Sequence, residues 1–283
     1  MSTIGELRAE LAALLRSKYP ADRADFDALY ILSELTGLNH SELLLNADRS
    51  VDVFAAAIDA VQRRLCDEPL QYIFSRAYFM DLTLYVTPSV LIPRPETELL
   101  AEWVVKRAPL GGRVLDVGTG SGAIALAVAA TRPDLEVTAV DKSAAALAVA
   151  RKNLLTCGLS NVTMLESDLF SALAGQKFDL IAANLPYVSA SEYAECPAEV
   201  RLFEPHNALV AADSGLALMR AAIAASPGVL VQGGAIILEM GETQGEAVSS
   251  MLAVAGFTEV GILKDYTGRE RFAVATMPVC PSA

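Results

Sequence analysis

Two patterns of hydrophobic residues divide the chain. From Ile4 to about Leu65, apolar residues recur at intervals of three and four positions, as Leu7, Leu11 and Leu15 illustrate. This spacing is typical of amphipathic helices that bury one face. The pattern predicts a small helical bundle in the N-terminal part of the chain.

After residue 95, short apolar runs alternate with longer stretches of helical periodicity. Strands are predicted near residues 113–117, 136–140, 162–165, 178–183, 234–239, 259–263 and 271–276. Helices are predicted near residues 96–107, 121–131, 143–157, 213–226 and 243–255. Such alternation favours an α/β fold with a mainly parallel seven-stranded sheet covered by helices on both faces.

A short connecting region separates these two patterns. Residues 78–86 have the alternation of a hairpin, and a proline-rich stretch follows at 88–95. The sequence therefore predicts three parts: a bundle at 1–68, a hairpin and connector at 69–95, and a larger domain at 96–283.

Composition and charge narrow the function classes. The chain has 283 residues, 53% of them hydrophobic, and a formal net charge of −12. The acidic balance argues against binding bare nucleic acid, which needs a basic surface to neutralise phosphates. The apolar runs stay below the roughly 18 residues needed to span a bilayer. We therefore expect a soluble cytoplasmic protein with no direct nucleic-acid partner and no membrane association.

Cysteine and histidine residues, the usual ligands of zinc and similar metals, are few and scattered along the sequence. No Cys-x-x-Cys pair occurs, and the two histidines lie far apart in the sequence. We therefore expect no metal site. The residues concerned are Cys66, Cys157, Cys196, Cys280, His40 and His206.

A glycine-rich loop follows the first predicted strand of the larger domain. Gly118, Gly120 and Gly122 let the backbone approach a ligand closely, near the free N–H groups at the start of the next helix. Asp141, about 20 residues further on, is placed to bind ribose hydroxyls. Asp116, just before the loop, could meet a cationic amino-acid group. The loop predicts a site for a nucleoside that carries a positively charged amino acid; the alternative is a turn that only packs helix on sheet.

A second motif, Asn184-Leu185-Pro186-Tyr187, directly follows the predicted strand at 178–183. Ligands of α/β sheets bind at the carboxyl ends of strands. The Asn184 side-chain oxygen and the Leu185 backbone oxygen could each accept one hydrogen of an amide or exocyclic amine. The motif thus predicts an acceptor site for planar nitrogen, held in line with a methyl donor. The alternative is a Pro-Tyr turn that only caps the strand.

With further motifs, the chain resembles the S-adenosylmethionine-dependent glutamine methyltransferases that modify the Gly-Gly-Gln loop of peptide-chain release factors. The resemblance covers nearly the whole chain, and its most specific part is the connector. The segments that carry it, besides the two motifs above, are Glu68–Ile73, Val90–Glu98, Glu204-Pro205 with Ala208-Leu209, Asp213 with Gly215-Leu216, Leu238–Gly241, and Asp265 with Gly268–Arg271.

The resemblance implies a class I methyltransferase (Rossmann-like) sheet and the cofactor S-adenosyl-L-methionine, with S-adenosyl-L-homocysteine as product. It further implies that Asn184 to Tyr187 hold the glutamine amide and that the bundle docks the release factor. We expect a monomer. The implied cofactor residues are Gly118, Thr119, Gly120, Ser121 and Gly122 around the methionine part, Asp141 at the ribose, Asp168 and Leu169 at the adenine, and Asn184 beside the methyl group.

Two positions depart from the family pattern. The family usually has Asn-Pro-Pro-Tyr, whereas Leu185 stands at the second position here; we expect activity to persist because the substrate needs only the backbone carbonyl. Leu169 replaces an aromatic residue that is frequent in relatives, which predicts slightly weaker cofactor binding.

His206 is expected to be a loop residue and not a base.

The motifs are compatible with three rival functions. The Asn-Leu-Pro-Tyr motif also resembles that of ribosomal-RNA adenine dimethyltransferases, but the acidic charge and the connector at 93–96 argue against an RNA substrate. A glutamine methyltransferase acting on a ribosomal protein is a second rival. A scaffold that binds the cofactor without turnover would be favoured only if Asn184 or the glycine loop were broken, and both are intact.

Overall fold

A computed structural model describes residues 2–279, so Cys280 lies outside the described residues. The chain forms two compact units. The first contains Met1–Arg76 and Pro197–Phe203, and the second contains Ala77–Cys196 and Glu204–Ala283. The chain thus returns to the first unit for a short segment late in the sequence. The three-part functional division at residues 68 and 95 stays a prediction.

The first unit is the predicted helical bundle. Leu7, Leu11 and Leu15 are fully buried, as their spacing predicts. Thr3 caps the first helix through a reciprocal pair of hydrogen bonds with Glu6. Its elements are α1 (Ile4–Leu15), α2 (Ala21–Thr36), α3 (His40–Leu45), α4 (Phe54–Leu65), α5 (Leu70–Ile73), α10 (Ala198–Phe203) and the paired strands β1 (Ser2–Thr3) and β2 (Ser50–Val51).

A buried ion pair ties three helices of this unit together. The side chain of Arg64, on α4, is 1% exposed and donates to Asp27 Oδ2 on α2 at 2.8 Å. Its Nη1 lies 2.7 Å from Glu199 Oε2 on α10. The guanidinium also lies over the ring of Tyr19, 4.4 Å from its centroid. These contacts explain why the segment at 197–203 belongs to the bundle.

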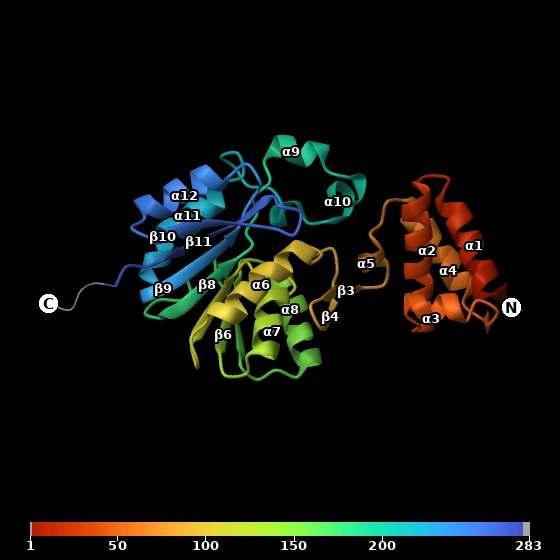
Figure 1. The fold of residues 1–283 in the computed structure, drawn as a ribbon, viewed down its shortest axis with the longest axis horizontal. Helices are drawn as coiled ribbons and strands as arrows, with labels where there is room; N and C mark the ends of the chain where they lie inside the picture. Colours follow the sequence, from red (N-terminus) through yellow and green to blue (C-terminus); the bar gives the residue numbers. More distant parts are fainter. Residues whose placement is uncertain (1, 280–283) are drawn as a thin grey trace. The chain divides into compact units, whose positions relative to one another are not determined.

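The second unit contains the predicted mainly parallel seven-stranded sheet (Figure 1). The strand order is β10-β11-β9-β8-β5-β6-β7, and only β11 runs antiparallel to its neighbours, β9 and β10. The strands are β5 (Arg113–Val117), β6 (Glu136–Asp141), β7 (Val162–Glu166), β8 (Phe178–Ala183), β9 (Leu230–Glu239), β10 (Thr258–Lys264) and β11 (Glu270–Thr276). The predicted hairpin is β3 (Arg76–Phe79) with β4 (Leu82–Tyr85).

Helices cover both faces of this sheet (Figure 1). Val114 and Leu115, neighbours on β5, belong to different hydrophobic cores: the first is shared with α6, α7 and α8, the second with α11 and α12. The helices are α6 (Pro95–Arg107), α7 (Ala123–Thr131), α8 (Ala144–Cys157), α9 (Ala190–Glu195), α11 (Ala217–Ala225) and α12 (Gly245–Val254), with 3₁₀ turns η1 (His206–Ala208) and η2 (Ser226–Gly228).

Two element boundaries differ from the sequence prediction by four residues. The helix predicted from residue 213 begins only at Ala217, because Asp213, Ser214 and Gly215 all have positive φ. Strand β9 begins at Leu230, four residues before the predicted start at 234.

The parallel register brings the two sequence motifs together. On the central strand β5, Val117 pairs with Val140 on β6 and with Ala183 on β8. The glycine loop after β5, the acid ending β6 and the Asn184 motif after β8 therefore leave the same edge of the sheet side by side. Among residues 2–279, no helix is long and apolar enough to cross a membrane.

The Arg64 ion pair generates a stability prediction. Asp27→Ala leaves a buried guanidinium without its fully buried carboxylate partner, so the free energy of unfolding should fall by about 3–5 kcal/mol. Asp25→Ala, on the same helix, removes only a half-exposed pair with Arg16 and should cost about 0–1 kcal/mol. Urea unfolding of both full-length variants, with amide hydrogen exchange in α2 and α4, measures the difference. Equal losses would contradict this account of the bundle.

Candidate active site

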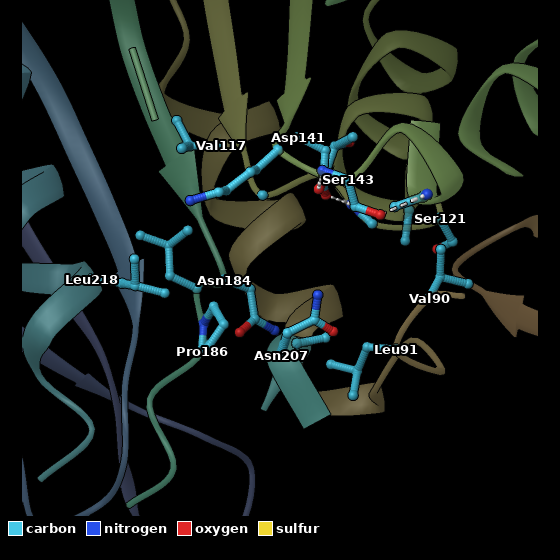
Figure 2. Close-up of a pocket in the computed structure, with 18 of the residues that line it drawn as sticks. Val90, Leu91, Val117, Ser121, Asp141, Ser143, Asn184, Pro186, Asn207 and Leu218 are labelled. Atoms are coloured by element: carbon cyan, nitrogen blue, oxygen red, sulfur yellow. Dashed lines mark hydrogen bonds between the residues drawn. The ribbon is translucent and has the colours of Figure 1, made fainter. Parts of the chain in front are cut away.

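A cavity of about 620 Å³ opens at the carboxyl ends of the central strands. Its walls come from the glycine loop, the turns after β6, β7 and β8, the connector and the η1 segment. Figure 2 shows Asp141 and Ser143 on one side of this cavity and Asn184, Pro186 and Asn207 on the other. The structure therefore joins the two motifs that the sequence singled out.

The glycine loop approaches the Asn184 motif closely. Gly118 and Gly120 have φ values of +76° and +56°, which other residues adopt only with strain. A Cβ on Gly118 would lie 3.0 Å from Leu185 Cδ2, so a side chain there would press on the motif. Thr119 and Ser121 also line the cavity. Gly122 does not line it; a Cβ at this position would press on Leu126 within α7.

Asp116 supports the loop from behind. It is fully buried and accepts from Thr119 Oγ1 at 2.6 Å and from the Ala125 N–H at 3.2 Å. Burial raises the pKa of Asp116 to about 7, and its Oδ1 has no hydrogen-bond partner among the described residues. Asp116 does not line the cavity, so a cationic ligand would meet it only across the loop.

Asp141 lines the cavity and organises the turns around it. One carboxylate oxygen accepts from the Gly120 N–H at 2.9 Å, and the other accepts from the Ser143 N–H at 2.8 Å. A carboxylate has about four lone-pair sites, so each oxygen keeps one for a ligand. The residue can thus hold the loop and accept from hydroxyl groups together.

Asp168 and Leu169 lie at the mouth of the same cavity. Asp168 forms an exposed ion pair of 2.9 Å with Lys142. Leu169 has a φ of +50°, in the left-handed region, and its carbonyl accepts from Ser167 Oγ at 2.8 Å. A left-handed leucine costs conformational energy, which the fixed Ser167 contact helps to maintain.

The acceptor motif is divided between the cavity and the core behind it. Asn184, Leu185 and Pro186 line the cavity. Tyr187 lies outside it and donates from its hydroxyl to Glu239 Oε1 at 3.1 Å. Burial and the neighbouring Glu239 raise the pKa of Tyr187, so its hydroxyl stays protonated and does not act as a base.

The Gln244 side chain and Gly215 fix the backbone of the Asn184–Tyr187 motif at the Tyr187 carbonyl. Gln244 Nε2 donates to the Tyr187 carbonyl at 2.9 Å. Gly215, with a φ of +85°, lies so close that a Cβ would overlap the same carbonyl oxygen. Two segments that carry no obvious chemistry in the sequence therefore fix the path of the motif.

Several cavity residues were missed in the sequence. The connector forms a wall through Val90, Leu91 and Arg94, although the sequence indicated only a link between domains. Buried Glu204 holds this wall, accepting from the Ile92 N–H at 3.2 Å and from Arg94 Nη2 at 2.5 Å. The only available signal was the resemblance of both segments to one family.

The η1 segment supplies a further wall. His206, expected as a loop residue, lines the cavity from this 3₁₀ turn and packs edge-on against Tyr193, with ring centroids 4.8 Å apart. Asn207 lines the cavity beside it (Figure 2). Within residues 2–279, no group of three or more His, Cys, Asp or Glu side chains could hold a metal ion.

Comparisons with known proteins cover both units. Residues 6–74 match the family model of the PrmC N-terminal domain, and residues 95–210 match that of the methyltransferase small domain. The crystal structure of a methyltransferase from Pyrococcus furiosus aligns with a TM-score of 0.55 at 18% identity, covering 78% of this chain and 99% of that one. This likeness supports the fold.

Two relatives match almost from end to end. The release factor glutamine methyltransferase of Salmonella typhimurium is 42% identical over 248 residues, which cover 87% of this chain and 89% of the relative. The release factor glutamine methyltransferase of Escherichia coli is 40% identical over 268 residues, which cover 94% of this chain and 95% of the relative.

The contact of Gly215 with the motif can be tested against a matched glycine. Gly215→Ala combines an unfavourable φ with an overlap on the Tyr187 carbonyl, whereas Gly268→Ala meets the same φ, +83°, with open space around it. We expect about 1 kcal/mol of destabilisation for Gly268→Ala and at least about 3 kcal/mol for Gly215→Ala. Thermal unfolding of both variants gives the comparison. Similar losses would show that the motif does not depend on this close approach.

Proposed function

The chain belongs to the release factor glutamine methyltransferase family, and we propose that it methylates the side-chain amide of the glutamine in the Gly-Gly-Gln loop of peptide-chain release factors. The methyl group comes from S-adenosyl-L-methionine in this proposal. The observation that carries the proposal is the position of Asn184 on the wall of one cavity with the glycine loop and Asp141.

The cavity fits a nucleoside that carries an amino acid. Its volume of about 620 Å³ lies within the range of small-molecule sites. Gly118 and Gly120 line the cavity with backbone alone, and Asp141 keeps lone pairs for ribose hydroxyls. Thr119 and Ser121 complete the loop around the methionine part, and Asp168 and Leu169 lie at the adenine end. When bound, S-adenosyl-L-methionine supplies a sulfonium methyl group and leaves as S-adenosyl-L-homocysteine.

The acceptor site works by alignment. The Asn184 side-chain oxygen and the Leu185 carbonyl each accept one N–H of the glutamine amide, and Pro186 stiffens the turn between them and Tyr187. An amide nitrogen is a poor nucleophile, so its orientation toward the methyl group and the exclusion of water lower the barrier. The nitrogen takes the methyl group by direct displacement, and its proton then leaves to water.

The Leu185 departure is compatible with this mechanism. Its side chain is 5% exposed and packs above Gly118, so it is held in place without a second proline ring. Its backbone carbonyl is the group that the glutamine would use. Leu169 likewise offers an apolar surface to the adenine, and we propose that only aromatic stacking is lost.

The helical bundle is proposed to dock the release factor. It exposes large apolar side chains that a protein partner could cover, with Leu45 84% and Leu44 52% exposed. We further propose that the protein acts as a monomer in the cytoplasm. Within residues 2–279, Cys66, Cys157 and Cys196 are free thiols, as is usual in a reducing compartment.

The substrate assignment is tested by comparing candidate substrates. The enzyme and labelled S-adenosyl-L-methionine are incubated with an unmodified release factor, a ribosomal protein mixture and unmodified ribosomal RNA, and the labelled species is identified. Label should enter the release factor at its Gly-Gly-Gln glutamine, as mass spectrometry of the peptide would show. Label on ribosomal protein would instead support the second glutamine substrate, and label on RNA alone would overturn the proposal.

The two halves of the site should respond separately to mutation. Asn184→Ala should lower kcat by about 100-fold or more, because the glutamine amide loses the preorganised Asn184 oxygen that accepts its N–H. Cofactor affinity should barely change. Asp141→Ala should weaken cofactor binding by roughly tenfold or more, since hydrogen bonds to a charged group are lost. Calorimetry with S-adenosyl-L-homocysteine and steady-state kinetics separate these effects. Full turnover by Asn184→Ala would remove the acceptor assignment.

A further inference from the structure

We propose that Thr97 and Glu239 are positioning residues that set which end of the Asn184 amide faces the acceptor. The inference rests on the proposed function, because it concerns how the same site recognises a glutamine amide. It assigns roles to two residues outside the motif, one at the start of α6 and the other at the end of β9.

A continuous chain of hydrogen bonds joins these residues. Asn184 Nδ2 donates to Thr97 Oγ1 at 3.1 Å, and Thr97 Oγ1 donates to Glu239 Oε2 at 2.7 Å. The other carboxylate oxygen of Glu239 accepts from the Tyr187 hydroxyl at 3.1 Å. Thr97 and Glu239 are 5% and 2% exposed, so little water competes for these bonds.

The direction of each bond follows from the number of protons available. An ionised carboxylate only accepts, so the single hydroxyl proton of Thr97 must point to Glu239. The Thr97 oxygen can then only accept a bond from Asn184. The Asn184 atom that faces Thr97 is therefore the Nδ2 donor, and Oδ1 is left for the cavity. The hydrogen-bond network thus fixes the orientation of the Asn184 amide.

The neighbours of Glu239 determine whether its carboxylate is charged and therefore only accepts hydrogen bonds. Burial raises the pKa of Glu239, while the hydroxyls of Thr97 and Tyr187 and the positive charge of Arg271 act against that rise. The negative charge of Glu96, like burial, raises the pKa of Glu239. The network thus provides two hydroxyl donors and a cation for the charged form, the form in which Glu239 only accepts.

The orientation decides which side chain the site accepts. A glutamine amide offers two N–H donors, one of which the Asn184 oxygen can accept. A glutamate carboxylate offers only acceptors, which would meet that oxygen unfavourably. If Asn184 turned over, Nδ2 would face the cavity and the preference would reverse. The Thr97–Glu239 pair therefore acts on discrimination between amide and carboxylate, and not only on the stability of the fold.

The test uses the full chain with Thr97→Val, which keeps the shape but removes the hydroxyl, and Thr97→Ser, which restores it. Thr131→Val is the matched control, because the Thr131 hydroxyl donates to the Ala127 carbonyl within its own helix, α7. Two quantities are measured: kcat for an unmodified release factor, and inhibition by the same release factor with Glu in place of the Gly-Gly-Gln glutamine. Affinity for S-adenosyl-L-homocysteine is followed in parallel.

We expect Thr97→Val to lower kcat about tenfold or more and to tighten the inhibition constant of the Glu form at least about fivefold, as for a lost and inverted polar contact. Cofactor affinity should stay within about twofold, a change worth less than one hydrogen bond. Thr97→Ser and Thr131→Val should behave like the wild type. A merely structural role for Thr97 would not tighten binding of the Glu form.

Two failures are distinguishable. If the wild type methylates the release factor but Thr97→Val leaves kcat and the inhibition constant unchanged, the positioning role is wrong and the proposed function stands. If the wild type does not methylate the release factor, the proposed function is wrong and the inference falls with it. Should Thr97→Val fail to fold, Thr97→Ala takes its place and is judged by the same inhibition constant.

Discussion

The site depends on the close approach of two backbone turns. Gly118 and Leu185 are in contact across the ends of β5 and β8, and the parallel pairing of Val117 with Ala183 puts them there. Because Gly118 has no side chain, the turn proposed to bind the methyl donor and the turn proposed to bind the acceptor line one cavity. Direct transfer between two bound molecules requires this proximity, since the reacting atoms must come almost into contact.

Three hydrogen-bonded carboxylates, of which Glu204 and Glu239 are buried, hold the remaining walls in register. Asp141 joins two turns through backbone N–H groups, Glu204 joins the connector to the η1 segment, and Glu239 joins α6 to the acceptor motif. Burying a carboxylate is costly unless its oxygens are hydrogen-bonded. Each of these acids uses both of its oxygens, Glu204 on two neighbouring residues of the connector and the other two on separate segments, and these contacts also define the shape of the site.

The strands and the glycine loop could be predicted because their signals are local. Apolar runs mark β5 and β8 directly, and Gly118 and Asp141 follow strands at recognisable positions. Helix α9 could not be predicted, because none of its residues is buried and no apolar periodicity marks it. Thr97 and Glu239 were visible in family motifs, yet their contact joins positions 142 residues apart. Such pairings depend on how the helices pack on the sheet, which no short stretch of sequence encodes.

The return of the chain to the bundle at residues 197–203 has a consequence for how the two units can be separated. Cutting once after Arg76 would not separate the two units cleanly. Helix α10 belongs to the bundle unit but would remain attached to the larger one. That helix would have lost the guanidinium of Arg64, and Glu199 would lack its buried partner. The bundle is thus interwoven with the larger unit along the sequence. Any exchange of bundles between relatives must transfer the late segment along with the first 76 residues.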